Sequence, residues 1–384
     1  MVGSRLRTAG PRRRAAATHP VPAVPAPTRT AGRERDARLD FGRAAAIAAV
    51  VLIHVASPVT DGYRSRPLGG WLIAIGAQSL VRWCVPVFVM LSGALLLNPA
   101  RPVPAGPFYR RRLRRIVIPL LAWSVFYIAL QSATGTGSPE LRSRTVSGTV
   151  TVLLAGRPSY HLYFLFLMLG LYLVTPFVAE LTRTADRRLL GLAATVVLLL
   201  GCADSSISWW TTGAPLNGVS MFVPYLGYYL AGCYLYRHGW RAATSGWLLL
   251  LGVLVLAAGT AALTVPLVAR YGVERGYYLF GYLSPTVMPA AVAVFALVLR
   301  RSGRPTVRTG RWAGWTRRMS DDAFGVFLVH PAITGGYREL VGVPTAAPAV
   351  AGYLIEGVVA VFAISVVITE ALRRLPATRA LVGE

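Results

Sequence analysis

The chain has 384 residues, of which 54% are hydrophobic and 14% are charged, and its formal net charge is +25. A soluble protein of this length needs more polar surface, and many apolar stretches here reach the roughly 20 residues that cross a bilayer as a helix. The arginines fall in short clusters between apolar segments, which argues against nucleic acid as a partner. The composition therefore predicts an all-α polytopic membrane protein of the plasma or inner membrane.

Residues 1–38 are rich in Arg, Ala, Pro and Thr and show no apolar period. This composition predicts a disordered basic arm on the cytoplasmic side. An alternative is a secretory leader with residues 44–53 as its apolar core and HVAS as its cleavage site. We favour a membrane anchor, because the apolar run is long enough to stay in the bilayer. The rest of the chain is then one membrane domain, residues 39–372, with a cytoplasmic tail at 373–384.

Apolar segments recur along the membrane domain and predict about ten transmembrane helices. Cytoplasmic loops carry an excess of basic residues. Placing both termini in the cytoplasm assigns 30 arginines to the inner loops and tails and 8 to the outer loops. The second span is long enough to be tilted or broken, and Pro331 interrupts the short ninth span. The predicted spans are 41–59, 71–97, 116–134, 161–181, 189–206, 217–236, 246–268, 278–299, 323–340 and 349–371.

The first span, LDFGRAAAIAAVVLIHVAS, carries ionisable side chains within an apolar run. Arg43 and His54 are 11 residues apart, which on an α-helix is three turns plus about 20° and about 16 Å along the axis. Both side chains therefore lie on one face, and Asp40 can pair with Arg43 three residues later. Taken singly, Arg43 is explained as an interfacial anchor and His54 as a helix-to-helix hydrogen bond. The shared face favours one polar channel, since a charge in the bilayer core costs on the order of 3 kcal/mol.

Further ionisable side chains lie in later spans and are candidates to meet this face. Arg82 is deep in the second span, His330 is in the ninth and Glu356 is in the tenth, so each is expected to face protein, water or a partner. His161 opens the fourth span, where a place in the interfacial aromatic belt is the alternative. The three cysteines lie in or beside apolar segments and predict neither a disulfide framework nor a metal site.

Several blocks of the sequence resemble those of the acyltransferase-three family of integral membrane acyltransferases. The family's first helix has an arginine, ten residues and then a histidine, as Arg43 and His54 do here. The segment HLYFL resembles the branch that acylates surface polysaccharides, with Tyr163 where Trp is commoner. The resemblance covers residues 39 to about 372. Its blocks, in order, are DFGRAAAIAAVVLIH, RWCVPVFVMLSGALLL, FYRRRLRRIVIPLLAW, SYHLYFLFLMLGLYLVTP, MFVPYLGYYLAGCYL and SDDAFGVFLVHP.

This resemblance implies transfer of an acyl group, often acetyl, from cytoplasmic acyl-coenzyme A to a hydroxyl of a surface glycan, glycolipid or related acceptor. Coenzyme A carries phosphates, which arginine suits. Arg43 and the basic loop are therefore expected to dock the donor, although such a cluster also fixes topology. The basic loop residues are Arg110, Arg111, Arg112, Arg114 and Arg115.

Within that reaction, His54 is expected to act as the general base on the acceptor hydroxyl, or to carry the acyl group covalently. Arg82 is expected to stabilise the oxyanion and His161 to position the acceptor. Ser92 is a candidate nucleophile or hydrogen-bond donor, although a Ser-Gly pair in a membrane helix is commonly a packing feature. The supporting residues are Asp40, Ser92, His330 and Glu356.

Two alternatives are consistent with the same residues. A polytopic transporter or flippase also has about ten spans and buried charges, and it would move a cargo without acyl-coenzyme A. An acyltransferase of this kind could also act on a secreted small-molecule metabolite. The sequence determines neither the acyl chain nor the oligomeric state.

Overall fold

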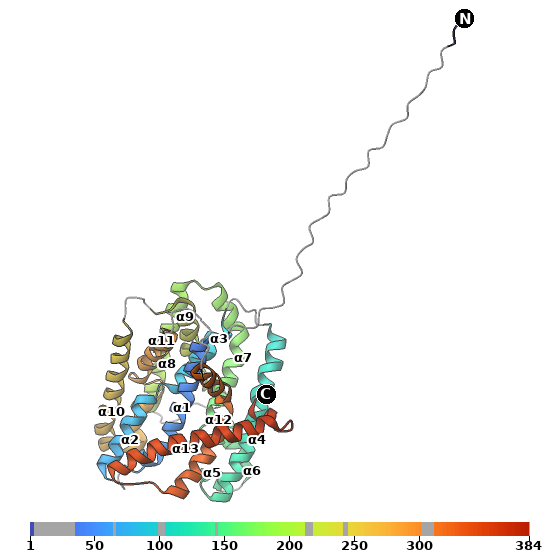
Figure 1. The fold of residues 1–384 in the computed structure, drawn as a ribbon. Helices are drawn as coiled ribbons and strands as arrows, with labels where there is room; N and C mark the ends of the chain where they lie inside the picture. Colours follow the sequence, from blue (N-terminus) through green and yellow to red (C-terminus); the bar gives the residue numbers. More distant parts are fainter. Residues whose placement is uncertain are drawn as a thin grey trace. The chain divides into compact units, whose positions relative to one another are not determined.

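The computed structural model describes residues 1–3, 35–63, 67–98, 104–142, 145–211, 218–240, 245–300 and 311–383. By its contacts the chain divides into Met1–Arg35 and Asp36–Glu384, and all the described helices belong to the second unit (Figure 1). Most of the predicted amino-terminal arm and the loop at 301–310 lie outside the described residues.

The secondary structure of the described residues is helical and contains no strand, which confirms the predicted all-α class. The α-helices are α1 (Ala37–Thr60), α2 (Leu68–Val81), α3 (Cys84–Leu96), α4 (Ala105–Thr134), α5 (Pro139–Arg142), α6 (Val146–Leu154), α7 (Tyr163–Thr184), α8 (Arg187–Thr211), α9 (Leu226–His238), α10 (Gly246–Gly276), α11 (Val287–Arg300), α12 (Arg311–Val341) and α13 (Ala347–Arg374). The 3-10 helices are η1 (Val223–Tyr225), η2 (Tyr277–Phe280) and η3 (Arg379–Val382).

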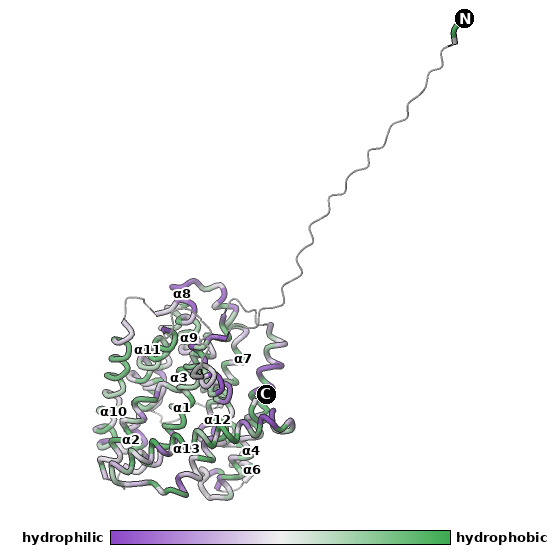
Figure 2. Tube along the Cα trace, in the orientation of Figure 1, coloured by the Kyte–Doolittle hydropathy of each residue, from purple (hydrophilic) through white to green (hydrophobic). Residues whose placement is uncertain are grey.

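Seven stretches in the described part of the chain are long and apolar enough to cross a membrane: α1, α2 with α3, α4, α7, α8, α10 with η2, and α13. This confirms a multi-pass membrane protein, while the count of ten spans stays a prediction. α9 and α11 have only 13 and 14 residues, about 20 Å at 1.5 Å per residue. α12 has 31 residues but several charged ones. Figure 2 shows hydrophobic residues along most of α10 and hydrophilic ones at the turn from α7 to α8.

The second predicted span is broken into α2 and α3 at Arg82 and Trp83. Pro86 lies in the first turn of α3 and has no N–H to donate to the carbonyl of Arg82, so the helical hydrogen-bond ladder is interrupted there. The break leaves Arg82 as the C-cap of α2, inside the domain.

α3 and α9 cross with their backbones in close contact. A Cβ added at Gly93 of α3 would lie 1.9 Å from the carbonyl oxygen of Tyr229, and one added at Gly232 of α9 would lie 2.0 Å from that of Met90. Small residues allow such crossings, and van der Waals contact is what holds membrane helices together. Gly93 is therefore a packing residue, which is the alternative that the sequence analysis gave for the Ser-Gly pair.

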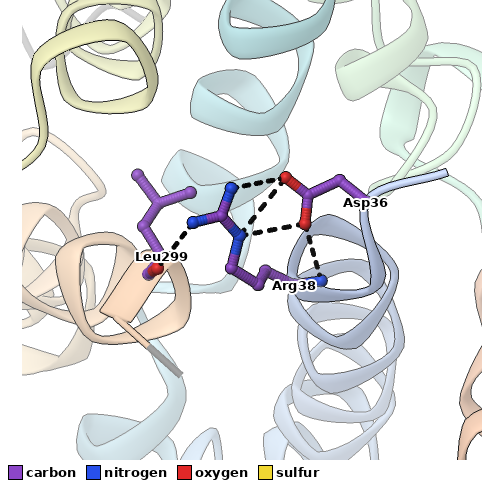
Figure 3. A network of polar contacts seen from close by, with 3 residues as sticks. All are labelled: Asp36, Arg38 and Leu299. Carbon is purple, nitrogen blue, oxygen red and sulfur yellow. Dashed lines mark hydrogen bonds and ion pairs between the residues drawn. The ribbon is translucent and has the colours of Figure 1, made fainter. Parts of the chain in front are cut away.

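The start of α1 is tied to the end of α11 by a small polar network (Figure 3). Asp36 is the N-cap of α1 and accepts a hydrogen bond from the backbone N–H of Arg38 at 3.0 Å. The Arg38 guanidinium pairs with Asp36 at 2.7 Å and donates to the Leu299 carbonyl at 3.1 Å. Burial raises the pKa of Asp36, but the hydrogen bonds from Arg38 outweigh it and hold that pKa below its ordinary value. The charged network fixes the end of α1 at which Arg43 lies.

The residues after α13 pack against α4. The indole N–H of Trp123 donates to the Leu381 carbonyl at 2.9 Å, and the Arg115 guanidinium donates to the Gly383 carbonyl. The segment predicted as a tail thus begins with the last turn of α13 and continues as an ordered cover over α4.

Candidate active site

Three histidines from separate parts of the sequence meet inside the domain: His54 of α1, His161 just before α7, and His330 of α12. The ring centroids of His54 and His330 are 5.1 Å apart, and those of His161 and His330 are 5.7 Å apart. His161 and His330 are only 1% and 0% exposed. We call these three residues the histidine cluster. No group of His, Cys, Asp or Glu side chains in the described residues is placed to hold a metal ion.

Two nitrogens of the histidine cluster are free to take part in chemistry. The Nδ1 of His330 lies 3.0 Å from the carbonyl oxygen of Val326, so it carries the proton and leaves Nε2 as an acceptor. The Nδ1 of His161 lies 3.2 Å from the Ser159 hydroxyl. The Nε2 atoms of His161 and His330 are buried and have no hydrogen-bond partner among the described residues. Buried polar atoms without partners are rare and commonly mark sites that receive a ligand.

Aromatic rings surround the histidine cluster. The Tyr160 ring lies 4.7 Å from that of His54, and the rings of Tyr127 and Phe327 lie 4.8 Å and 5.4 Å from that of His161. The Tyr127 hydroxyl donates to the Leu328 carbonyl at 2.7 Å, which fixes this ring against α12. These rings pack against the imidazoles of His54 and His161, and Tyr160 itself is exposed.

A cavity of about 310 Å³ is lined in part by Phe327, which packs on His161, and we call it the arginine cavity. It is lined by four arginines and one aspartate, and by apolar rings that lead to Phe327 beside the cluster. The charged lining residues are Arg43, Arg112, Arg115, Arg373 and Asp321, and the apolar rings are Phe88, Phe164, Tyr172, Phe324 and Phe327.

Arg43 is held in the arginine cavity by two partners. It donates to the Ser320 hydroxyl at 2.9 Å and lies 3.8 Å from the Asp40 carboxylate, which confirms the predicted pair. Ser320 in turn donates to Asp40 at 2.8 Å, and Asp40 is buried. The carboxylate thus reaches Arg43 both directly and through Ser320.

Arg43 and His54 both face α12, as their spacing predicts. Arg43 meets Ser320 and, 11 residues later, His54 meets His330, so α1 and α12 run in the same direction. The two contacts are separated by about 16 Å along α1 at 1.5 Å per residue. The two contacts mark the two ends of the α1–α12 interface, and apolar residues separate them.

A second cavity of about 420 Å³ lies beside Tyr160, and we call it the tyrosine cavity. Its lining is Arg157, Tyr160, Tyr163, Leu167, Met221 and Tyr225. Tyr160 links the cavity to the cluster, because its ring also lies against that of His54. The two cavities share no lining residue.

Two predicted site residues do not pack on the rings of the histidine cluster. Arg82 is an electrostatic neighbour of His54, donates to the Gln78 side chain and lies 4.4 Å over the Phe280 ring, and its Nε atom is buried without a partner among the described residues. Ser92 lines the arginine cavity, but its hydroxyl donates to the Phe88 carbonyl at 3.0 Å.

Two further predictions differ from the structure in position. Glu356 is exposed on α13 and has no ion pair in the described part of the chain, although a charged residue in a span was expected to need a partner. In the basic loop, only Arg112 and Arg115 line the arginine cavity. Arg112 and Arg115 are three residues apart and share a helix face, whereas Arg110, Arg111 and Arg114 are exposed and do not line the cavity.

The structure also brings to the candidate site residues that the sequence analysis did not identify. Ser320 precedes His330 by ten residues, much as Arg43 precedes His54 by eleven, and this parallel spacing was a usable signal. Arg373 of α13 pairs with Asp322 of α12, and Tyr127 of α4 packs on His161. These two contacts join residues far apart in the chain, and no local pattern indicates them.

The comparisons with known proteins agree with this arrangement. A family model described as an acyltransferase domain, that of the acyltransferase-three family, matches residues 36–370. No curated protein and no solved structure is significantly similar to the chain. The matched region contains α1 to α12 and most of α13, and so includes the histidine cluster and the tyrosine cavity. The chain therefore belongs to the acyltransferase-three family and is a multi-pass membrane acyltransferase.

Proposed function

We propose that the protein is an O-acyltransferase that moves an acyl group from coenzyme A to a hydroxyl of a surface glycan, glycolipid or related acceptor. Acetyl is the acyl group that we propose. The observation that carries the proposal is that two separate cavities, one cationic and one aromatic, each contain an aromatic residue that packs on the histidine cluster. A two-substrate transfer needs donor and acceptor held together at one reacting centre, and two separate cavities beside the cluster could each hold one of them.

The arginine cavity is the proposed donor site. Coenzyme A carries phosphates, and guanidinium groups bind phosphate with paired charge-assisted hydrogen bonds. Arg43, Arg112, Arg115 and Arg373 surround the cavity. The apolar rings beyond them suit the extended arm that carries the thioester toward Phe327 and the histidine cluster. The excess of arginines on this side supports a cytoplasmic position, where acyl-coenzyme A is made.

His54 is the proposed general base. The acceptor oxygen attacks the thioester carbonyl while its proton passes to the imidazole of His54. When the tetrahedral intermediate collapses, the C–S bond breaks and the coenzyme A sulfur takes the proton back from the imidazolium. The products are an ester and free coenzyme A, and His54 returns to its neutral form.

The neighbouring groups have proposed roles in the same step. His330 presents an unprotonated Nε2 toward the cluster and orients His54, while His161 positions the acceptor hydroxyl. Arg82 is the proposed electrostatic stabiliser of the oxyanion, because it carries a buried N–H without a partner among the described residues. If His54 instead carried the acyl group, an acyl-enzyme would accumulate before acceptor is added.

The experiment that tests this function uses inside-out membrane vesicles and acetyl-labelled coenzyme A. Wild type, His54→Ala and His238→Ala are compared at matched protein levels, and label is followed into lipid, polysaccharide and small-molecule fractions. His238 is the matched control, because it lies at the end of α9 and outside the cluster. Label that appears with wild type and His238→Ala but not with His54→Ala supports the proposal. Wild-type vesicles that transfer no label from any acyl donor would contradict it and favour transport.

A further inference from the structure

The tyrosine cavity holds an unusual combination of groups for a membrane protein. Three of its six lining residues are tyrosines, and its volume of about 420 Å³ is in the range of a small-ligand pocket. The hydroxyl of Tyr163 is buried and has Tyr282 as its polar neighbour. Flat apolar rings with polar tips suit a ligand that is itself both apolar-faced and rich in hydroxyls, such as a sugar ring.

Arg157 is the one charged side chain that lines the tyrosine cavity, and no acidic side chain lines it. Arg157 is exposed, and in the described part of the chain its guanidinium has neither an ion pair nor a hydrogen bond. Arg338 is an electrostatic neighbour of Tyr160 and adds positive charge, although it also pairs with Glu339 at 2.8 Å. The cavity therefore carries a positive charge that nothing in the described chain neutralises.

The backbone holds Arg157 in position. Gly156 has a φ of +70°, which an L side chain rarely adopts, and an added Cβ would lie 2.8 Å from the Cα of Gly218. The Gly218 N–H donates to the Leu154 carbonyl at 3.1 Å, and the Arg157 N–H donates to the Val152 carbonyl at 3.0 Å. The Arg157 side chain therefore extends from a turn whose backbone is fixed by hydrogen bonds.

We infer that the tyrosine cavity binds the acceptor as a sugar ring that carries a carboxylate or a phosphate, with that anion on Arg157 and a ring hydroxyl directed to Tyr160 and His54. This inference rests on the proposed function and names the acceptor class that it leaves open. A guanidinium pairs with carboxylate and phosphate in the same forked geometry, so both anions fit. An anionic sugar would gain a charge-assisted hydrogen bond from Arg157 that a neutral sugar cannot make.

The test uses purified protein in nanodiscs and measures binding apart from turnover. The probes are methyl β-glucuronide, glucose 1-phosphate and neutral methyl β-glucoside, and binding is followed by titration calorimetry. Wild type is expected to bind at least one anionic probe about tenfold more tightly than the neutral one, and Arg157→Gln to remove that difference. Arg270→Gln is the matched control, since Arg270 is exposed at the end of α10 and lines neither cavity. The two anionic probes separate a sugar acid from a sugar phosphate as the source of the charge.

The outcomes keep the inference and the proposed function apart. If wild type binds neither anionic probe more tightly than the neutral one, or if Arg157→Gln binds all three as wild type does, the inference is wrong. If wild type transfers no acyl group in the vesicle assay, the proposed function is wrong, whichever probes the protein binds. Selective probe binding together with transfer of label to an acidic or phosphorylated glycan supports both.

Discussion

The arginine cavity and the tyrosine cavity differ in how their charges are held. Arg43 lies 3.8 Å from Asp40 and Arg373 pairs with Asp322, whereas Arg157 has no carboxylate partner in the described chain. Paired arginines are oriented in advance and still leave the lining of the arginine cavity with more positive than negative groups. The difference suits one site that always binds the same highly charged donor and another that selects an acceptor by a single charge.

The position of the histidine cluster gives this comparison its chemical meaning. Phe327 lines the arginine cavity and lies 5.4 Å from the His161 ring, while Tyr160 lines the tyrosine cavity and lies 4.7 Å from the His54 ring. Each cavity therefore reaches the cluster through its own aromatic residue. Changes in one cavity should alter one substrate's KM, and changes in the cluster should alter kcat.

The largest effect is expected for His54→Ala, which removes the proposed general base. We expect kcat to fall about 10²–10⁴-fold, the usual contribution of a general base, with little change in either KM. Initial rates over a matrix of donor and acceptor concentrations measure this. A fall in kcat/KM that comes from one KM alone would move His54 from the centre of the reaction into one binding site.

Arg112→Gln is expected to weaken the donor alone. Loss of a charge-assisted hydrogen bond costs about 1.5–3 kcal/mol, so the donor KM should rise by about tenfold or more while the acceptor KM stays the same. Arg111→Gln is the matched control, because Arg111 is the adjacent residue of α4 and does not line the arginine cavity. Equal effects of the two variants would show that the basic loop acts only through its overall charge.

Gly93→Ala is expected to destabilise the wall of the arginine cavity. The added methyl group would overlap the Tyr229 carbonyl, and overpacking of this kind costs about 1–3 kcal/mol. Since α3 supplies Phe88 and Ser92 to the arginine cavity, the donor KM should rise as the thermal midpoint falls. Gly106→Ala on α4 is the control, because its Cβ would meet open space. An unchanged midpoint in Gly93→Ala would mean that the crossing of α3 and α9 is looser than the contacts indicate.

The smallest effect is expected for Tyr163→Phe in the tyrosine cavity. Removing one neutral hydrogen bond to a ligand costs about 0.5–1.5 kcal/mol, so the acceptor KM should rise about two- to tenfold with the donor KM unchanged. Tyr172→Phe is the control, because Tyr172 lines the arginine cavity. If Tyr163→Phe changed the donor KM instead, the assignment of the two cavities would have to be reversed.

Much of the candidate site was predictable because it depends on local geometry. Helical spacing alone places Asp40, Arg43 and His54 on one side of α1, and the contacts with Ser320 and His330 confirm that side. The same spacing rule, applied to the basic loop, would have selected Arg112 and Arg115 together, but only the cavity shows which face of α4 matters.

The sequence by itself determined the membrane environment, the helical class, the family and the polar face of α1, because hydropathy and the 3.6-residue period are properties of consecutive residues. Only the tertiary structure decided that His161 and His330 join His54, that Glu356 stays outside, and that two cavities lie beside the cluster. In a membrane, lipid tails are as apolar as leucine, so hydrophobicity does not choose helix partners. Close contacts such as that of Gly93 with Tyr229 make that choice, and they depend on the shapes of residues far apart in the chain.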